Sequence, residues 1–237
     1  MTAITDIGNY VLEKLESSGY EAFYVGGFVR DMLMNKQCHD IDITTNALPE
    51  EVKNVFSAFN VIETGIRHGT VTVVIDHTPV EITTYRTEKG YSDSRHPDEV
   101  KFSRIVADDL SRRDFTINSM AFNPKSGIVD LFGGREDLNN HVIRCVGDSK
   151  TRFTEDALRI LRALRFSSVL GFEIEKGTAD AAFECRNRLL NLSAERIASE
   201  VGKMLCGDNV REVIIKYADI LSVIFPFVEK MKGFDQK

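Results

Sequence analysis

The chain has 237 residues, of which 43% are hydrophobic and 28% are charged, and its formal net charge is −6. This composition is typical of a globular protein with one large or two small domains, and the negative charge argues against a generally basic nucleic-acid-binding surface. No run of about 18 uncharged apolar residues is present, so we expect no membrane span.

The first 145 residues predict short strands and helices in irregular alternation. Apolar residues at helical spacing predict an amphipathic helix over 5–18, and an apolar and aromatic run predicts a buried strand over 22–25. Pro49, followed by two acidic residues, predicts the start of another helix. Further strands are expected over 61–63, 71–75 and 80–85. Residues 90–98 are rich in Gly, Ser, Asp and Pro and predict a long loop. This alternation favours an α+β fold over regular βαβ repeats.

From about residue 146 the pattern becomes helical. Apolar residues at helical spacing predict one helix over 154–170. Ser193 is suited to cap a second helix over 193–205. Residues 210–224 predict one or two more helices. We therefore expect the last part of the chain to be all-α.

A glycine pair follows the first predicted strand. Gly26 and Gly27 end the strand, and residues 29–34 read as a helix start. A strand, a glycine turn and a helix N-terminus aim backbone N–H groups at an anion. Arg30 can add a guanidinium for phosphate oxygens. Two adjacent glycines alone indicate only a turn, but this combination predicts a phosphate-binding segment.

Two carboxylates follow this turn. On a strand, the side chains of Asp40 and Asp42 would point to one face, with Cα atoms roughly 6.5–7 Å apart. Such a pair can share divalent ions, and paired metals suit in-line phosphoryl displacement. A lone D-x-D is usually a solvated edge, but the neighbouring glycine turn favours a metal site. Glu81, inside a predicted strand, is either a third carboxylate of this site or a solvent-facing residue.

Two further polar segments can contact a nucleotide. In residues 112–118 the arginines can reach a triphosphate, and Asp114 or Asn118 can reach a ribose hydroxyl, although this segment alone carries little weight. Glu155 and Asp156 lie four and three residues before Arg159, so the three can share a helix surface. Such a group either stabilises the helix or presents donors and acceptors that match the edge of a base. The spacing leaves both interpretations open.

Several common motifs are absent from the sequence. There is no G-x-x-x-x-G-K and no G-x-G-x-x-G, which excludes P-loop and dinucleotide-binding folds. The four cysteines show no C-x-x-C spacing, and none of the five histidines has metal-ligand spacing, which argues against an unrelated metal-dependent phosphohydrolase. The first residues lack a basic region followed by an apolar core, so no signal peptide is expected. We expect a cytoplasmic protein with reduced thiols.

Four segments together resemble the successive motifs of the class II tRNA nucleotidyltransferase and bacterial poly(A) polymerase family. In chain order they are Gly26-Gly27-x-Val29-Arg30-Asp31, Asp40-x-Asp42, residues 112–118, and Glu155-Asp156-x-x-Arg159-x-x-Arg162. Both their order and their spacing match. The resemblance implies an α+β fold: a DNA-polymerase-β-like nucleotidyltransferase head with a mixed sheet over 1–145. An all-α neck over 146–205 and the start of an all-α body over 206–237 would follow.

The resemblance also implies roles for individual residues. Asp40 and Asp42 would be catalytic and bind Mg²⁺, with Glu81 as a further catalytic carboxylate. The nucleotide would be bound by Gly26, Gly27, Arg30, Arg113, Asp114, Asp156, Arg159, Arg162 and Arg165. Of these, Gly27 and Arg30 would cradle the triphosphate. Asp156 and Arg159 would recognise the base, in a pocket that Arg162 and Arg165 also line.

The implied activity is template-independent addition of CCA, or its terminal A, to tRNA 3′ ends from CTP and ATP. Residues 65–71 resemble the tRNA-directed members, and residues 86–100 resemble a flexible loop of the A-adding members. We therefore favour CCA addition over A-only addition, and both over poly(A) polymerase. The rival from another class is a catalytically silent RNA-binding module, against which the intact Asp40 and Asp42 argue. Family members usually continue further, so the chain resembles an N-terminal fragment.

Overall fold

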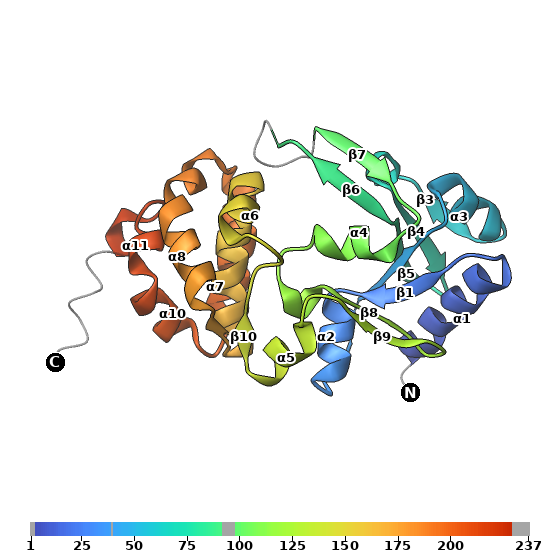
Figure 1. Cartoon of the computed structure of the whole chain (residues 1–237), viewed down its shortest axis with the longest axis horizontal. Helices are drawn as coiled ribbons and strands as arrows, with labels where there is room; N and C mark the ends of the chain where they lie inside the picture. The colour runs from blue at the N-terminus through green and yellow to red at the C-terminus, as the bar shows by residue number, and fades with distance from the viewer. Residues whose placement is uncertain (1–2, 39, 92–97, 229–237) are drawn as a thin grey trace. The chain divides into compact units, whose positions relative to one another are not determined.

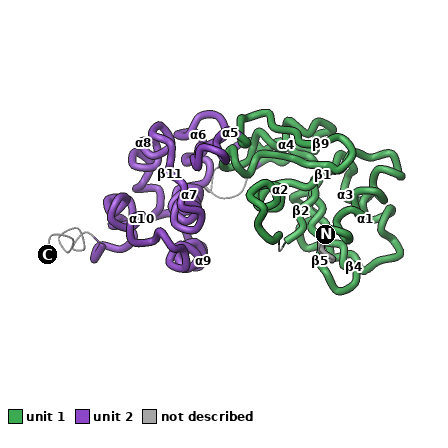
Figure 2. The backbone as a smooth tube through the Cα atoms, turned by 90° about the horizontal axis from the view of Figure 1, so that it is seen from below, with its two compact units in different colours: residues 1–89, 99–135 green, residues 90–98, 136–237 purple. Residues whose placement is uncertain are grey.

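The computed structural model describes residues 3–38, 40–91 and 98–228 (Figure 1). The chain forms two compact units, which Figure 2 shows in different colours. Unit 1 comprises residues 1–89 and 99–135, and unit 2 comprises residues 90–98 and 136–237. No helix in the described part of the chain is long and apolar enough to cross a membrane. The division into head, neck and body at residues 145 and 205 stays a prediction.

Unit 1 is built on a mixed seven-stranded sheet with the strand order β3-β4-β5-β2-β1-β8-β9 (Figure 1). β2 and β5 are parallel, and the other neighbouring pairs are antiparallel. The strands are β1 (Ala22–Val25), β2 (Ile41–Thr45), β3 (Asn60–Ile62), β4 (Thr70–Ile75), β5 (Thr78–Thr84), β8 (Met120–Asn123) and β9 (Gly127–Asp130). The α+β class and the mixed sheet are therefore confirmed.

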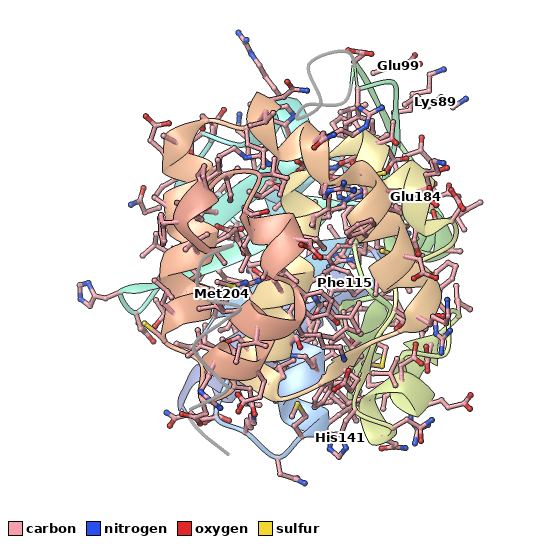
Figure 3. The ribbon with its side chains drawn as sticks, turned by 90° about the vertical axis from the view of Figure 1, so that its left-hand side faces the viewer. Lys89, Glu99, Phe115, His141, Glu184 and Met204 are labelled. Atoms are coloured by element: carbon pink, nitrogen blue, oxygen red, sulfur yellow. The ribbon has the colours of Figure 1, made fainter. Side chains whose placement is uncertain are left out.

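Short helices and one hairpin complete unit 1. The helical elements are α1 (Ala3–Ser17), α2 (Gly27–Leu33), α3 (Pro49–Val55), η1 (Ile66–His68), α4 (Val106–Ser111) and η2 (Thr116–Asn118), with α5 (Gly134–Asn139) crossing into unit 2. The hairpin consists of β6 (Arg86–Lys89) and β7 (Glu99–Phe102), which pair Lys89 with Glu99 (Figure 3). Most of the loop predicted over 90–98 lies outside the described residues.

Side-chain alternation gives the sheet of unit 1 one apolar and one polar face at its centre. In β5, Val80 and Ile82 are buried, whereas Glu81 between them is exposed. β2 pairs Asp42 with Glu81, so these two acidic residues share a face. Helix α1 covers the apolar face, where the Tyr24 hydroxyl of β1 donates to a backbone carbonyl of α1 at 3.2 Å. The acidic pair therefore lies on the opposite face.

Helix α4 packs on the face of the acidic pair. Consecutive residues of a strand point to opposite faces, so Val25 faces away from the side of Tyr24. Val25 forms a buried cluster with Leu110 of α4 and Ala121 of β8. The segment that directly follows α4 begins with two arginines. The packing of α4 brings this segment to the polar face of the sheet.

Unit 2 is mainly helical, as predicted. Its elements are β10 (Val142–Ile143), α6 (Ser149–Glu155), α7 (Leu158–Leu170), β11 (Glu173–Ile174), α8 (Lys176–Cys185), η3 (Arg186–Asn191), α9 (Ala194–Leu205), α10 (Val210–Lys216) and α11 (Ala218–Leu221). The single helix predicted over 154–170 is wrong, because the chain is extended at Asp156 (φ −144°, ψ 106°) and divides it into α6 and α7. The Asp156 carboxylate accepts a hydrogen bond from the Leu158 N–H at 3.0 Å, so it supports the start of α7.

Candidate active site

The turn at Gly26 lies close to the guanidinium of Arg113 and the carboxylate of Asp42 in unit 1. Gly26 has φ 66° and ψ −132°, a conformation that residues with a Cβ rarely adopt. A Cβ at Gly26 would lie 3.2 Å from Arg113 Nη1 and 3.8 Å from Asp42 Oδ2. Helix α2 begins directly at Gly27, two residues earlier than predicted. The glycine at position 26 thus allows the turn to approach both charged groups.

The three predicted carboxylates lie close enough to interact. Asp42 is half-buried on β2 beside Glu81, whereas Asp40 is exposed and precedes β2, which begins at Ile41. The prediction that both aspartates lie on a strand is therefore right for Asp42 alone. Burial and the negative charge of Glu81 raise the pKa of Asp42, Arg113 lowers it, and Asp40 adds a smaller increase. Glu81 is exposed and also faces the site, so the two interpretations offered for it are compatible.

This carboxylate set suits a divalent ion whose coordination the substrate completes. No group of three or more His, Cys, Asp and Glu side chains within the described ranges is arranged to hold a metal by itself. Mg²⁺ is typically bound through one or two carboxylates together with substrate phosphates, and it prefers oxygen ligands. Asp40 and Asp42 supply oxygen ligands only, and burial, followed by the negative charge of Glu81, raises the pKa of Asp42, so a bound cation would stabilise its ionised form. The residues present therefore fit such an ion.

A buried acid that the sequence analysis missed holds the arginines of the site. Asp109 of α4 is 0% exposed, and its Oδ2 accepts from Arg113 Nη2 at 3.0 Å, while its Oδ1 accepts from Arg112 Nη2 at 2.6 Å. Burial favours a higher pKa for Asp109, but the two guanidiniums outweigh it and lower the pKa. The acid precedes the arginines by three and four residues, a helical spacing that could have revealed the pairs.

The other predicted residues of unit 1 are also fixed by neighbours. Arg30 donates through Nη1 to Asn118 Oδ1 at 2.8 Å and through Nε to Asp31 Oδ1 at 2.8 Å. Asp114 is buried, and its Oδ1 accepts from the Phe115 N–H at 2.8 Å. Arg30 thus contacts the polar segment 112–118, to which Asp114 belongs.

Replacing Gly26 by alanine should damage this site more than it damages the fold. The backbone conformation at Gly26 costs alanine about 1–3 kcal/mol, and the new Cβ would displace Arg113 Nη1. Gly19→Ala is the matched control, because Gly19 has φ +88° and a Cβ added there would meet nothing within 4 Å. We expect both variants to lose stability in thermal melts, but only Gly26→Ala to bind tripolyphosphate, a probe for the predicted phosphate-binding turn, weakly by calorimetry. Equal affinity for tripolyphosphate in the two variants would contradict the assignment of Gly26.

In unit 2 the side chains of the two proposed base-recognition residues form ion pairs with different residues, although the Arg159 N–H donates to the Asp156 carbonyl at 3.1 Å. Asp156 Oδ2 accepts from Arg196 Nη2 of α9 at 2.8 Å. Arg159 is buried, and its Nη1 pairs with Glu155 and also donates to the Arg152 carbonyl at 3.1 Å. Asp156 and Arg159 are therefore fixed separately, one by α9 and the other by the end of α6.

Helix α9 also holds the two following arginines of α7. Glu200 is buried, and its Oε2 lies 2.8 Å from Arg165 Nε, while its Oε1 lies 3.8 Å from Arg162 Nη1. The Arg165 guanidinium also lies 4.1 Å from the centroid of the Phe166 ring. Arg196 and Glu200 were not predicted, although their spacing of four residues places both on one face of α9. Helix α9 thus orients Asp156, Arg162 and Arg165. These are three of the four residues predicted on α7 and at its N-terminal boundary.

Two family models and several curated relatives match most of this chain. Residues 22–144 match the model of the poly(A) polymerase head domain, and residues 171–232 match that of the probable RNA and SrmB-binding site of polymerase A. The CCA-adding enzyme of Lactobacillus helveticus is 51% identical over 209 residues, which are 88% of this chain and 52% of the relative. That of Enterococcus faecalis is 50% identical over 199 residues, which are 84% of this chain and 48% of the relative.

Solved structures of CCA-adding enzymes have the same fold. The Bacillus stearothermophilus enzyme in complex with CTP matches with a TM-score of 0.84 and 38% identity, over 92% of this chain and 53% of that one. The Thermotoga maritima enzyme complexed with tRNA matches with a TM-score of 0.81 and 27% identity, over 98% of this chain and 56% of that one. The chain spans about half the length of the curated relatives it matches. Because the head-domain match covers slightly more than half of the chain, the chain belongs to the poly(A) polymerase head domain family, whose fold is the polymerase-β-like nucleotidyltransferase fold.

Proposed function

We propose that this chain carries the catalytic part of a template-independent RNA nucleotidyltransferase that adds CCA, or its terminal A, to tRNA 3′ ends. Its substrates would be CTP and ATP, and its metal would be Mg²⁺. Nucleotidyltransferases of this family use a divalent metal. The names of the relatives, CCA-adding enzymes at about 50% identity, support tRNA as the acceptor.

One observation carries the proposal. The half-buried Asp42 lies beside Glu81 on the polar face of the sheet, and the Gly26 turn and Arg113 converge on the same carboxylate. Acidic ligands for a cation thus adjoin a guanidinium and a backbone turn suited to phosphates. This combination serves transfer of a nucleotide better than binding of RNA alone, since a binding module has no need of the carboxylates.

In the proposed reaction the 3′-hydroxyl of the RNA attacks the α-phosphate of the nucleotide and pyrophosphate leaves. Asp40 and Asp42 would hold the divalent ion, which when bound lowers the pKa of the attacking hydroxyl and neutralises charge on the triphosphate. The triphosphate would be held by Gly26, Gly27 and Arg30. Arg113, which follows α4 in the chain, would also contact it. The protein then contributes mainly positioning and charge stabilisation.

Further residues of unit 1 would complete the nucleotide site. Asp114 would accept a hydrogen bond from the ribose. Glu81 would add negative charge beside Asp42, so that the ion is bound more tightly. Both roles require oxygens that face the polar side of the sheet, and the register of Glu81 with Asp42 supports this for Glu81.

Unit 2 would contribute the choice of base. Asp156 and Arg159 offer acceptors and donors that can pair with a base edge, and Arg162 and Arg165 would line the same pocket. Their fixed side chains favour this role, because a rigid row of polar groups distinguishes bases better than a mobile one. Helix α9 supports the row through Arg196 and Glu200.

The decisive experiment supplies the chain with tRNA transcripts that end before CC, at CC and at CCA. Each transcript is incubated with Mg²⁺ and each of the four nucleotides, and the products are resolved on a sequencing gel. CCA addition predicts C onto the first transcript, A onto the second and nothing onto the third. Addition of A alone to any RNA end would instead indicate a poly(A) polymerase, which the name of the matching family keeps as the second candidate. Nucleotide and RNA binding without any transfer would indicate a silent module.

A further inference from the structure

A buried carboxylate lies behind the arginine of the proposed triphosphate site. Asp109, in the first turn of α4, is 0% exposed. Its Oδ2 accepts from Arg113 Nη2 at 3.0 Å, and its Oδ1 accepts from Arg112 Nη2 at 2.6 Å and from Arg112 Nε at 3.0 Å. One carboxylate therefore binds two consecutive guanidiniums.

The guanidinium of Arg113 has two sides with different surroundings. One terminal nitrogen, Nη2, is bound by Asp109. The other, Nη1, lies 3.2 Å from the position of a Cβ at Gly26, which would itself lie 3.8 Å from Asp42 Oδ2. The buried Nε has no hydrogen-bond partner among the residues that the structure describes. Asp109 thus fixes Arg113 on one side and leaves Nη1 directed at the glycine turn.

Arg112 has a second acidic partner, whereas Arg113 has none among the residues that the structure describes. Arg112 Nη1 donates to Glu88 Oε1 at 3.1 Å, and Glu88 lies on β6, where it also accepts from Arg86 Nε at 2.8 Å. Within the described ranges, the ion pair to Asp109 is the only one that Arg113 makes. Asp109 and Glu88, whose side chain is 8% exposed, are therefore two acids of one network, and only Asp109 contacts Arg113.

We propose that Asp109 is a positioning residue, which holds Arg113 in the orientation that contacts the triphosphate of CTP or ATP. The inference rests on the proposed function and deepens it. A free arginine loses side-chain freedom when it binds phosphate, and a side chain that is already fixed loses less. A buried ion pair is by itself a weak source of stability, so orientation is the stronger reason for this one.

The charge of Asp109 has the opposite effect on nucleotide affinity from its proposed orienting role. A negative charge near a triphosphate repels it, so removal of that charge alone would tighten binding. Loss of orientation would weaken binding, by about three- to tenfold for one long side chain. Weaker nucleotide binding after removal of the Asp109 charge would therefore indicate a positioning role. Tighter binding would indicate that Asp109 acts through electrostatic repulsion alone.

The test measures CTP binding in the presence of MgCl₂ by calorimetry, for the whole chain and four variants. These are Asp109→Asn, Glu88→Gln, Arg113→Ala, and the double variant Asp109→Asn with Arg113→Ala. Tripolyphosphate serves as a second probe that lacks base and ribose. We expect Asp109→Asn to weaken both ligands about three- to tenfold. Glu88→Gln should bind as tightly as the unchanged chain or more tightly, and in the Arg113→Ala background Asp109→Asn should no longer weaken binding.

The outcomes distinguish the inference from the function on which it rests. No CTP binding by the unchanged chain would contradict the proposed function. Binding that Arg113→Ala weakens and Asp109→Asn leaves unchanged or tightens would overturn the positioning role alone. A full effect of Asp109→Asn in the Arg113→Ala background would also overturn it, because Asp109 would then act through the fold. If Asp109→Asn loses its native circular dichroism, Asp109→Glu keeps the charge but displaces it, and the same weakening is expected.

Discussion

Asp42→Asn is expected to abolish nucleotide addition, with a loss of about 10³-fold or more. A divalent ion held at such a carboxylate contributes several kcal/mol to transition-state stabilisation, and each 1.36 kcal/mol is a factor of ten in rate. The measurement is incorporation of CTP into tRNA with Mg²⁺, together with Mn²⁺ binding followed by electron paramagnetic resonance. Asp76→Asn, in the turn between β4 and β5, is the matched control, because Asp76 is an exposed carboxylate at a positive φ that asparagine tolerates.

The same variant should be more stable than the unchanged chain when no metal is present. Burial and the charge of Glu81 raise the pKa of Asp42 in the folded chain, so the folded chain binds this proton more tightly than the unfolded chain does. Ionised Asp42 therefore destabilises the fold at neutral pH, and that destabilisation is lost as the pH falls through the raised pKa. A neutral asparagine removes it, which should raise the melting temperature in EDTA at pH 7. Near-normal addition by Asp42→Asn with Mg²⁺ would refute the metal assignment.

Asp156→Ala is expected to reduce the selectivity for CTP and ATP over UTP and GTP. A base edge left without one hydrogen bond in a dry pocket costs about 1–3 kcal/mol, which corresponds to roughly tenfold to a hundredfold in discrimination. Incorporation of UTP and GTP relative to CTP and ATP should rise accordingly. Binding of tripolyphosphate should largely survive, because Arg30 and Arg113 belong to unit 1. Competition assays with all four nucleotides give the measurement.

A stability control is essential for Asp156, because its carboxylate, one residue before the N-cap Ala157, also accepts from the Leu158 N–H at the start of α7. Asp148 offers a matched case, since it caps α6 and its carboxylate accepts from the Thr151 N–H at 2.7 Å. Both Asp148→Ala and Asp156→Ala should lower the melting temperature, by the amount that about 1 kcal/mol of lost capping produces. Only Asp156→Ala should change the nucleotide preference. Unchanged selectivity in Asp156→Ala would leave helix capping as the whole role of this residue.

Local sequence patterns were sufficient for the fold class, the strand at 22–25 and the mainly helical second half. These features follow from local patterns: β5 alternates between buried and exposed residues, and α9 repeats its apolar residues at helical spacing. The motifs carried the family resemblance, because four short segments in a fixed order are rarely matched by chance. The glycine turn was visible because only glycine adopts the φ of 66° at position 26 readily.

Which of these residues meet depends on how the strands and helices pack. Gly26, Asp42 and Arg113 are far apart in the chain, and the order of β1, β2 and β5 in the sheet brings them together, which no local pattern specifies. The break at Asp156 was missed because a helical pattern continues through it, while the cap to Leu158 and the contact with Arg196 favour extended backbone there. The partners Asp109 and Glu200 were missed for the same reason: a buried acid is identified by its surroundings, and those come from other parts of the fold.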